Sequence, residues 1–182
     1  TAFVEFWDRY SADNSSWGAW AKFANDTDGV DGWDKNFSFS DGDGYYEFYS
    51  RAGDNAGNYE SAPGVCDALC GSDTTAPTSN ATPISPSATN VTAILINYTQ
   101  NDTLRGVKNV TLWYSYSSSG ASYGTWQKFS TESTTPTFSD FNFDFPNGDG
   151  YYQFYTRATD NASNWESAPG GNDTWVYRKL PD

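Results

Sequence analysis

The side chains in this sequence that could do chemistry are carboxylates, two thiols and many asparagines, because its 182 residues include no histidine. Histidine is the commonest general base, transition-metal ligand and catalytic-triad partner, so its absence disfavours triad hydrolases and most metalloenzymes. Paired carboxylates can hydrolyse glycosides, but in a chain with 23 Asp and Glu such pairs arise from composition alone. We therefore predict no catalytic residue and no enzymatic activity.

Two acidic turns are the candidate calcium sites. Asp41 and Asp43 alternate with glycines in the first turn, and Asp149 lies in the matching turn, 147–150. Carboxylate and carbonyl oxygens are the ligands that Ca²⁺ prefers, but neither turn has the acidic residue that closes an EF-hand loop. We expect plain turns whose glycines adopt positive φ, with no metal and with Ca²⁺ as the one cofactor left open.

The two cysteines, Cys66 and Cys70, are four positions apart. A zinc site needs about four ligands, and no others stand nearby at a suitable spacing. In an oxidising compartment we expect a disulfide between them. It would fix a connection but stabilise the fold little, because the loop that it closes is short.

Asparagine is the third group, because ten Asn-x-Ser/Thr sequons occur among only 15 asparagines. Chance alone would give about three or four. The excess predicts N-linked glycans on solvent-facing side chains of a protein outside the cytoplasm, the alternative being that a chain rich in Asn, Ser and Thr makes sequons by accident. The predicted acceptors are Asn14, Asn25, Asn36, Asn80, Asn90, Asn97, Asn101, Asn109, Asn161 and Asn172.

Charge and hydropathy disfavour two kinds of partner. The net charge of −13 repels nucleic acid, whose binding needs a basic stripe. No stretch approaches the roughly 20 apolar residues of a membrane span. We interpret the charge as an acidic, well-solvated surface, the alternative being Ca²⁺ binding or a coat suited to salty surroundings.

The elements that carry these residues are duplicated. Residues 1–63 align with 107–169 at a constant offset of 106, and 30 of the 63 positions are identical. The densest match sets 42–52 against 148–158. A unit of about 106 residues has the size of one β-sandwich domain rather than of a solenoid repeat.

Each unit is predicted to consist of strands. Runs of β-branched and aromatic residues between turn residues predict strands at 91–98, 109–117, 125–130, 138–145, 151–158 and 173–179. In the strand 45–52, alternate side chains from Tyr46 to Ala52 should face the core, and those from Tyr45 to Arg51 should face outward.

The segment 44–48 resembles strand F of immunoglobulin-like domains, with Phe48 at the place of the disulfide cysteine, and Tyr46 and Tyr152 then resemble the tyrosine corner. Segments 51–58 and 73–77 resemble the F–G hairpin and the opening linker of bacterial and archaeal immunoglobulin-like, or fibronectin-III-like, surface domains. The resemblance implies an all-β chain of two tandem immunoglobulin-like β-sandwiches from an extracellular surface or filament protein. It implies little about function, since such modules act as spacers, adhesins and polymer subunits alike.

The first unit is incomplete. Segment 75–106 precedes the second copy and has no counterpart before residue 1. We therefore predict a complete sandwich over 73–182 and, over 1–72, a sandwich that lacks its N-terminal strands and exposes a hydrophobic groove. We expect the groove to be filled by another subunit, as in donor-strand complementation, or by residues of a longer chain, and we favour the longer chain.

These features predict a structural extracellular glycoprotein, a subunit or segment of a filament, pilus-like fibre, surface layer or adhesin stalk. Its partners would be copies of itself and N-linked glycans. The alternative is a pair of accessory carbohydrate-binding modules from a secreted polysaccharide-degrading enzyme. Outward aromatic side chains bear on this choice: Trp7, Tyr45, Tyr49 and Trp113. They could stack on sugar rings or on a neighbouring subunit, but we favour packing between sheets or between domains.

Overall fold

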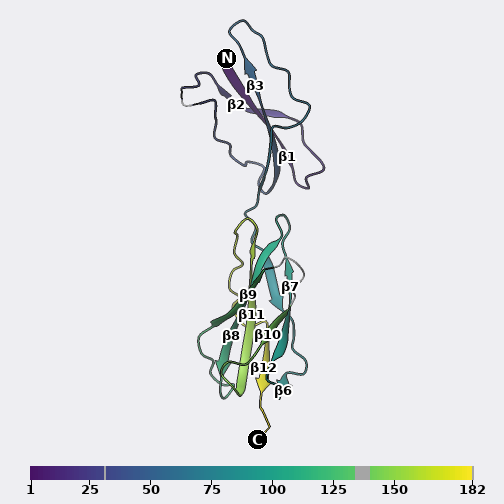
Figure 1. Cartoon of the computed structure of the whole chain (residues 1–182), viewed down its shortest axis with the longest axis vertical. Helices are drawn as coiled ribbons and strands as arrows, with labels where there is room; N and C mark the ends of the chain where they lie inside the picture. Colours follow the sequence, from purple (N-terminus) through teal and green to yellow (C-terminus); the bar gives the residue numbers. More distant parts are fainter. Residues whose placement is uncertain (31, 134–139, 182) are drawn as a thin grey trace. The chain divides into compact units, whose positions relative to one another are not determined.

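The computed structural model describes residues 1–30, 32–133 and 140–181. These residues form strands and loops without a helix, as predicted, and the chain divides into two compact units, Thr1–Thr74 and Thr75–Asp182 (Figure 1). The division lies two residues beyond the predicted boundary at 72.

Unit 2 contains two sheets, whose strands pair antiparallel except for β6. One has the order β10-β7-β5, and the other has the order β6-β12-β11-β8-β9, in which the short β6 pairs in parallel. Three strands against a longer, antiparallel second sheet is an immunoglobulin-like arrangement. The first sheet is built from β5 (Thr78–Ala81), β7 (Ile94–Asn101) and β10 (Asp140–Phe143), and the second from β6 (Ala88–Thr89), β8 (Val107–Ser117), β9 (Gln127–Ser133), β11 (Gly150–Asp160) and β12 (Thr174–Arg178).

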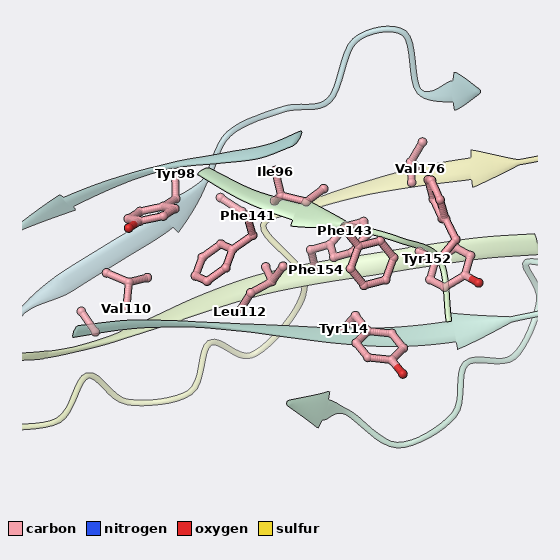
Figure 2. Packing of buried hydrophobic residues seen from close by; sticks show 13 residues of the cluster. Ile96, Tyr98, Val110, Leu112, Tyr114, Phe141, Phe143, Tyr152, Phe154 and Val176 are labelled. Atoms are coloured by element: carbon pink, nitrogen blue, oxygen red, sulfur yellow. The ribbon is translucent and has the colours of Figure 1, made fainter. Parts of the chain in front are cut away.

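The inner faces of the two sheets of unit 2 supply one buried core (Figure 2). Phe143 of β10 lies at its centre, with its ring 4.8 Å from that of Phe154 on β11 and 5.2 Å from that of Tyr114 on β8. Alternation along each strand sends these side chains to the same side. Fully buried members come from both sheets: Ala81, Ile96, Val110, Leu112, Phe143, Tyr152, Phe154, Ala158 and Val176.

In its described residues, unit 1 repeats the second of these sheets but not the first. Its strands have the order β2-β1-β3-β4, which is the order of their counterparts β9-β8-β11-β12. The register repeats too, because Tyr46 pairs with Cys70 as Tyr152 pairs with Val176. The four strands are β1 (Phe3–Ser11), β2 (Ala21–Asp26), β3 (Gly44–Gly53) and β4 (Ala68–Ser72), so the duplication continues past the residues whose identity reveals it.

A strand that forms in unit 2 is absent from unit 1, although the two sequences match closely. Residues 140–143 (Asp-Phe-Asn-Phe) form β10 by pairing with β7. Residues 34–37 (Asp-Lys-Asn-Phe) lie at the same offset but form no strand. No counterpart of β7 lies within the described part of unit 1, and an extended segment without a neighbour has no ladder to join.

The predicted strands of unit 2 are found with shifted ends. The prediction at 91–98 becomes β7, which begins at Ile94, and the prediction at 138–145 becomes β10, with residues 138 and 139 outside the described residues. Phe145 adopts φ 54°, which is incompatible with an extended strand. The short strands β5 and β6 were not predicted.

Candidate functional site: the open face of unit 1

The core-facing side of the unit 1 sheet is uncovered, as far as residues 1–30 and 32–74 show. Phe37 and Phe48 are half-buried there, whereas their counterparts in unit 2, Phe143 and Phe154, are fully buried. A hollow of about 250 Å³ lies over the sheet, and four phenylalanines help to line it: Phe6, Phe23, Phe37 and Phe48. We call these four residues the open face.

The open face already has the ring geometry of a core. Phe37 packs edge-on against Phe23 and Phe48, each at a centroid distance of 4.8 Å. Its counterpart Phe143 lies at the same 4.8 Å from Phe129 and Phe154. Half of a sandwich core is therefore in place before anything covers it.

Two carboxylates of unit 2 show how such a face is closed. Glu166 accepts hydrogen bonds from the Ser79 amide (2.8 Å), the Ser79 hydroxyl and the Ala158 amide (2.8 Å). Asp173 accepts from the amides of Ala81 (2.9 Å) and Thr156 (3.0 Å). Each acid thus joins a residue of β5 to a residue of β11, so the pair ties the first sheet of unit 2 to the second.

Unit 1 has acids at both equivalent positions, Glu60 and Asp67, and each bonds an amide of β3, the counterpart of β11. Glu60 accepts from the Ala52 amide at 3.1 Å, and Asp67 accepts from the Ser50 amide at 2.9 Å. A carboxylate has about four lone-pair sites, so each acid retains acceptor capacity on the side where β5 lies in unit 2. Sequence reasoning missed this role, although the identity of Asp67 and Asp173 at the offset of 106 was a signal for it.

Charged residues also lie on the core-facing side of unit 1. Asp8 stands where unit 2 has Tyr114, and burial, together with the charge of Asp41, raises the pKa of its carboxyl. Lys35 stands where unit 2 has Phe141, and its ammonium lies 3.0 Å from the carboxylate of Asp26, whose pKa it lowers. The covering sheet of unit 1 therefore cannot be a plain copy of β5, β7 and β10.

The two predicted corner tyrosines make the same contact in each unit. The hydroxyl of Tyr46 donates to the carbonyl of Gly42 (2.8 Å), and that of Tyr152 donates to the carbonyl of Gly148 (2.7 Å). Both rings are fully buried. A buried tyrosine bonded to backbone a few residues upstream is the geometry of a tyrosine corner, and it holds the turn before the strand.

The aspartates of the acidic turns accept hydrogen bonds from backbone amides. A carboxylate oxygen of Asp43 accepts from the amide of Thr74 at 2.8 Å, and Asp149 accepts from the equivalent amide of Leu180 at 3.1 Å. Asp149 also lies 3.2 Å from the guanidinium of Arg178, and Asp41 is exposed at the end of its turn. Gly42 and Gly148 adopt φ of 85° and 76°, as the prediction of plain turns requires.

Cys66 and Cys70 are thiols, contrary to the predicted disulfide. Cys70 lies within β4, whereas Cys66 lies before the bend at Asp67, whose amide donates to the carbonyl of Phe48. Burial and the neighbouring Glu47 raise the pKa of the Cys66 thiol, which lowers its reactivity.

The predicted glycan acceptors lie at the surface. All ten are exposed except Asn109, which is half-buried in β8. Asparagines outside sequons, such as Asn55 and Asn147, are exposed as well, so exposure permits glycosylation without selecting the sequons. Some acceptors already use their amides, since Asn161 donates to the carbonyls of Arg105 and Gly106.

The outward aromatic residues pack against one another. Tyr49 is only 6% exposed because Trp7 stacks on it at 5.8 Å and Trp20 meets it edge-on at 4.5 Å. Trp113 and Trp126 enclose Tyr155 in the same way, at 6.0 and 4.5 Å. These residues, with the half-buried Tyr45, form no open platform for a sugar ring.

Comparisons with known proteins leave the family open. No protein-family model and no curated protein sequence matches the chain. A solved structure of fibronectin(III)-like modules of Clostridium thermocellum CbhA is similar over 98% of this chain and 78% of that one, with 12% identity and a TM-score of 0.43. A likeness at this level decides nothing about function. Among the described residues, no helix is long and apolar enough to cross a membrane.

Proposed function

We propose that the chain is a non-catalytic structural element of an extracellular filament, surface layer or stalk, in which β-strands from outside residues 1–74 complete unit 1. The open face carries this proposal. Its rings are arranged as in the core of unit 2, and Glu60 and Asp67 stand where unit 2 binds β5. A copy of a neighbouring subunit or a further stretch of the same polypeptide could supply the strands.

The energetics favour an occupant. Full burial of one phenylalanine contributes about 1.5–3 kcal/mol relative to exposure. Covering four half-buried phenylalanines would then contribute on the order of 3–6 kcal/mol, which is comparable with the whole stability of a small domain. Unit 1 therefore gains about as much from being covered as a domain gains from folding, and this links its stability to assembly.

The sequons support a location outside the cell. Nine acceptor asparagines face solvent on both units, and an exposed Asn-x-Ser/Thr is the substrate of N-glycosylation in secreted proteins. In this proposal the glycans and the acidic surface keep the lateral faces of the array solvated, while strand exchange provides the specific contact.

Electron microscopy of the native protein, with mass spectrometry of its tryptic peptides, tests the proposal. We expect ordered fibres or arrays and hexose-containing mass additions at sequon peptides. Monodisperse single-chain particles without glycan, at the concentration found in the source material, would overturn it.

A further inference from the structure

A second hollow lies on the outer face of the five-stranded sheet of unit 2. It has a volume of about 300 Å³ and is lined by Gly120, Tyr123, Tyr151, Gln153 and Trp175. Tyr151 and Gln153 are on β11, Trp175 is on the neighbouring β12, and Gly120 and Tyr123 belong to the loop between β8 and β9. Trp175 is 44% exposed, and Gln153 is half-buried.

Unit 1 fills the equivalent place with its own side chain. The guanidinium of Arg9 lies 5.1 Å from the ring centre of Trp17, and its Nε donates to the Glu47 carboxylate at 2.6 Å. At the offset of 106, Arg9 corresponds to Ser115 and Glu47 corresponds to Gln153. Unit 2 therefore lacks both members of this ion pair, and it has a space beside the aromatic ring.

The replacements in unit 2 do not fill the space, and the loop beside it is held in place. The Ser115 hydroxyl is turned to the carbonyl of Gly124 at 2.7 Å, so it holds the loop instead of entering the hollow. Gly120 has φ 77°, and a Cβ there would lie 3.2 Å from the ring of Tyr151, so the loop can approach this ring closely because residue 120 is glycine.

The lining determines the kind of ligand. It contains no charged residue, so it offers no counter-ion to a charged ligand, and the net charge of −13 of the chain disfavours an anion. Aromatic rings offer apolar faces, and the Gln153 amide, which takes part in no hydrogen bond among the described residues, offers two donors and an acceptor. A pyranose ring matches this set, since it has a face of C–H groups and an edge of hydroxyls.

We infer that this hollow of unit 2 binds a neutral pyranose residue, with the C–H face of the sugar on the aromatic lining and its hydroxyls on Gln153. The site is distinct from the open face, and it does not require that unit 1 be completed by a strand. It differs from a duplicated sugar-binding platform, because in the described part of unit 1 the Arg9 side chain takes the equivalent place.

Isothermal titration of the full chain with neutral gluco-, manno- and galacto-configured tetrasaccharides tests this inference, with a uronic-acid tetrasaccharide as the charged comparison. We expect saturable binding of at least one neutral sugar. Trp175→Leu, which installs the residue of unit 1, should weaken it at least tenfold, and so should the double variant Ser115→Arg with Gln153→Glu, which rebuilds the ion pair that fills the space. Trp165→Leu, at a residue that is 59% exposed outside the hollow, is the matched control and should bind as the parent does.

Urea unfolding of each variant establishes that the fold is intact. No saturable binding of any neutral tetrasaccharide up to about 10 mM would overturn the inference. Binding that survives the double variant in a folded protein would overturn it equally, as would preference for the charged sugar.

Discussion

Replacing Glu166 by glutamine should destabilise unit 2 far more than the same change at Glu60 destabilises unit 1. Glu166 accepts three hydrogen bonds with its two oxygens, two from Ser79 and one from Ala158. Glutamine keeps one oxygen and sets an NH₂ group against the remaining donor. A lost bond to a charged group, together with a buried amide left without an acceptor, costs about 2–3 kcal/mol.

Among the described residues, the Glu60 carboxylate accepts from the Ala52 amide alone, at 3.1 Å. The carbonyl oxygen of glutamine can accept that bond, so the expected loss is below about 0.5 kcal/mol. When an external strand occupies the open face, Glu60 would accept hydrogen bonds from it as Glu166 accepts them from Ser79 of β5. Glu60→Gln should then weaken the association of that strand at least tenfold.

Thermal unfolding followed by hydrogen exchange and mass spectrometry resolves the two units. For unit 2, a loss of 2 kcal/mol lowers the midpoint by roughly 8–16 °C, since 1 kcal/mol corresponds to about 4–8 °C in a domain of this size. Ser79→Ala, which removes only the hydroxyl donor, should give a smaller loss and serves as the control. Equal losses from Glu166→Gln and Glu60→Gln in the isolated chain would refute the reasoning, because they would show that the contacts to β5 contribute nothing.

Three further predictions concern the corner, the core and pH. Tyr152→Phe should destabilise unit 2 by about 1.5–3 kcal/mol in urea unfolding. The change removes the hydrogen bond to the Gly148 carbonyl and leaves the Asn147 amide, 3.1 Å from the hydroxyl, without that acceptor. Tyr155→Phe is the control and should cost below about 0.5 kcal/mol. Phe143→Ala should cost about 3–5 kcal/mol, and Phe37→Ala less than half of that in the isolated chain, since its site is half-buried. The raised pKa of Asp8 means that the folded state binds its proton more tightly than the unfolded state, so the stability of unit 1 should fall as pH rises from the usual carboxyl pKa to the raised one. Asp8→Asn should abolish that fall in a pH series of unfolding midpoints, and an unchanged pH profile would contradict the assignment.

The sequence predicted the fold because the strongest signals are local. Alternating aromatic residues indicate the strand that carries Tyr152, and the glycine-rich turn before it marks where that strand begins. The offset of 106 reveals the duplication. The sequence did not predict that β4 and β12 pair with their neighbouring strands in the same register. Between the segments 65–72 and 171–178 only one position is identical, Asp67 with Asp173. Register depends on pairing across the sheet, which a single sequence records weakly.

The candidate sites were less predictable, because their roles depend on what packs opposite. Asp43 and Asp149 were predicted as weak calcium candidates, and the structure adds a role that the sequence did not indicate, since each accepts from a backbone amide that follows the last strand of its unit. The predicted disulfide is not formed, since the structure has Cys66 and Cys70 as thiols. The hollow beside Gln153 became visible only when the structure placed it opposite the loop that carries Tyr123.

Amide hydrogen exchange of residues 34–37 is the most direct test of the central claim that external strands complete unit 1. In the isolated chain these residues form no strand, whereas their counterparts 140–143 form β10 and provide an internal reference. In native assembled material we expect 34–37 to be protected to a degree comparable with 140–143, because a strand in the position of β7 would pair with them. Exchange at 34–37 that is as fast in native material as in the isolated chain would contradict the account.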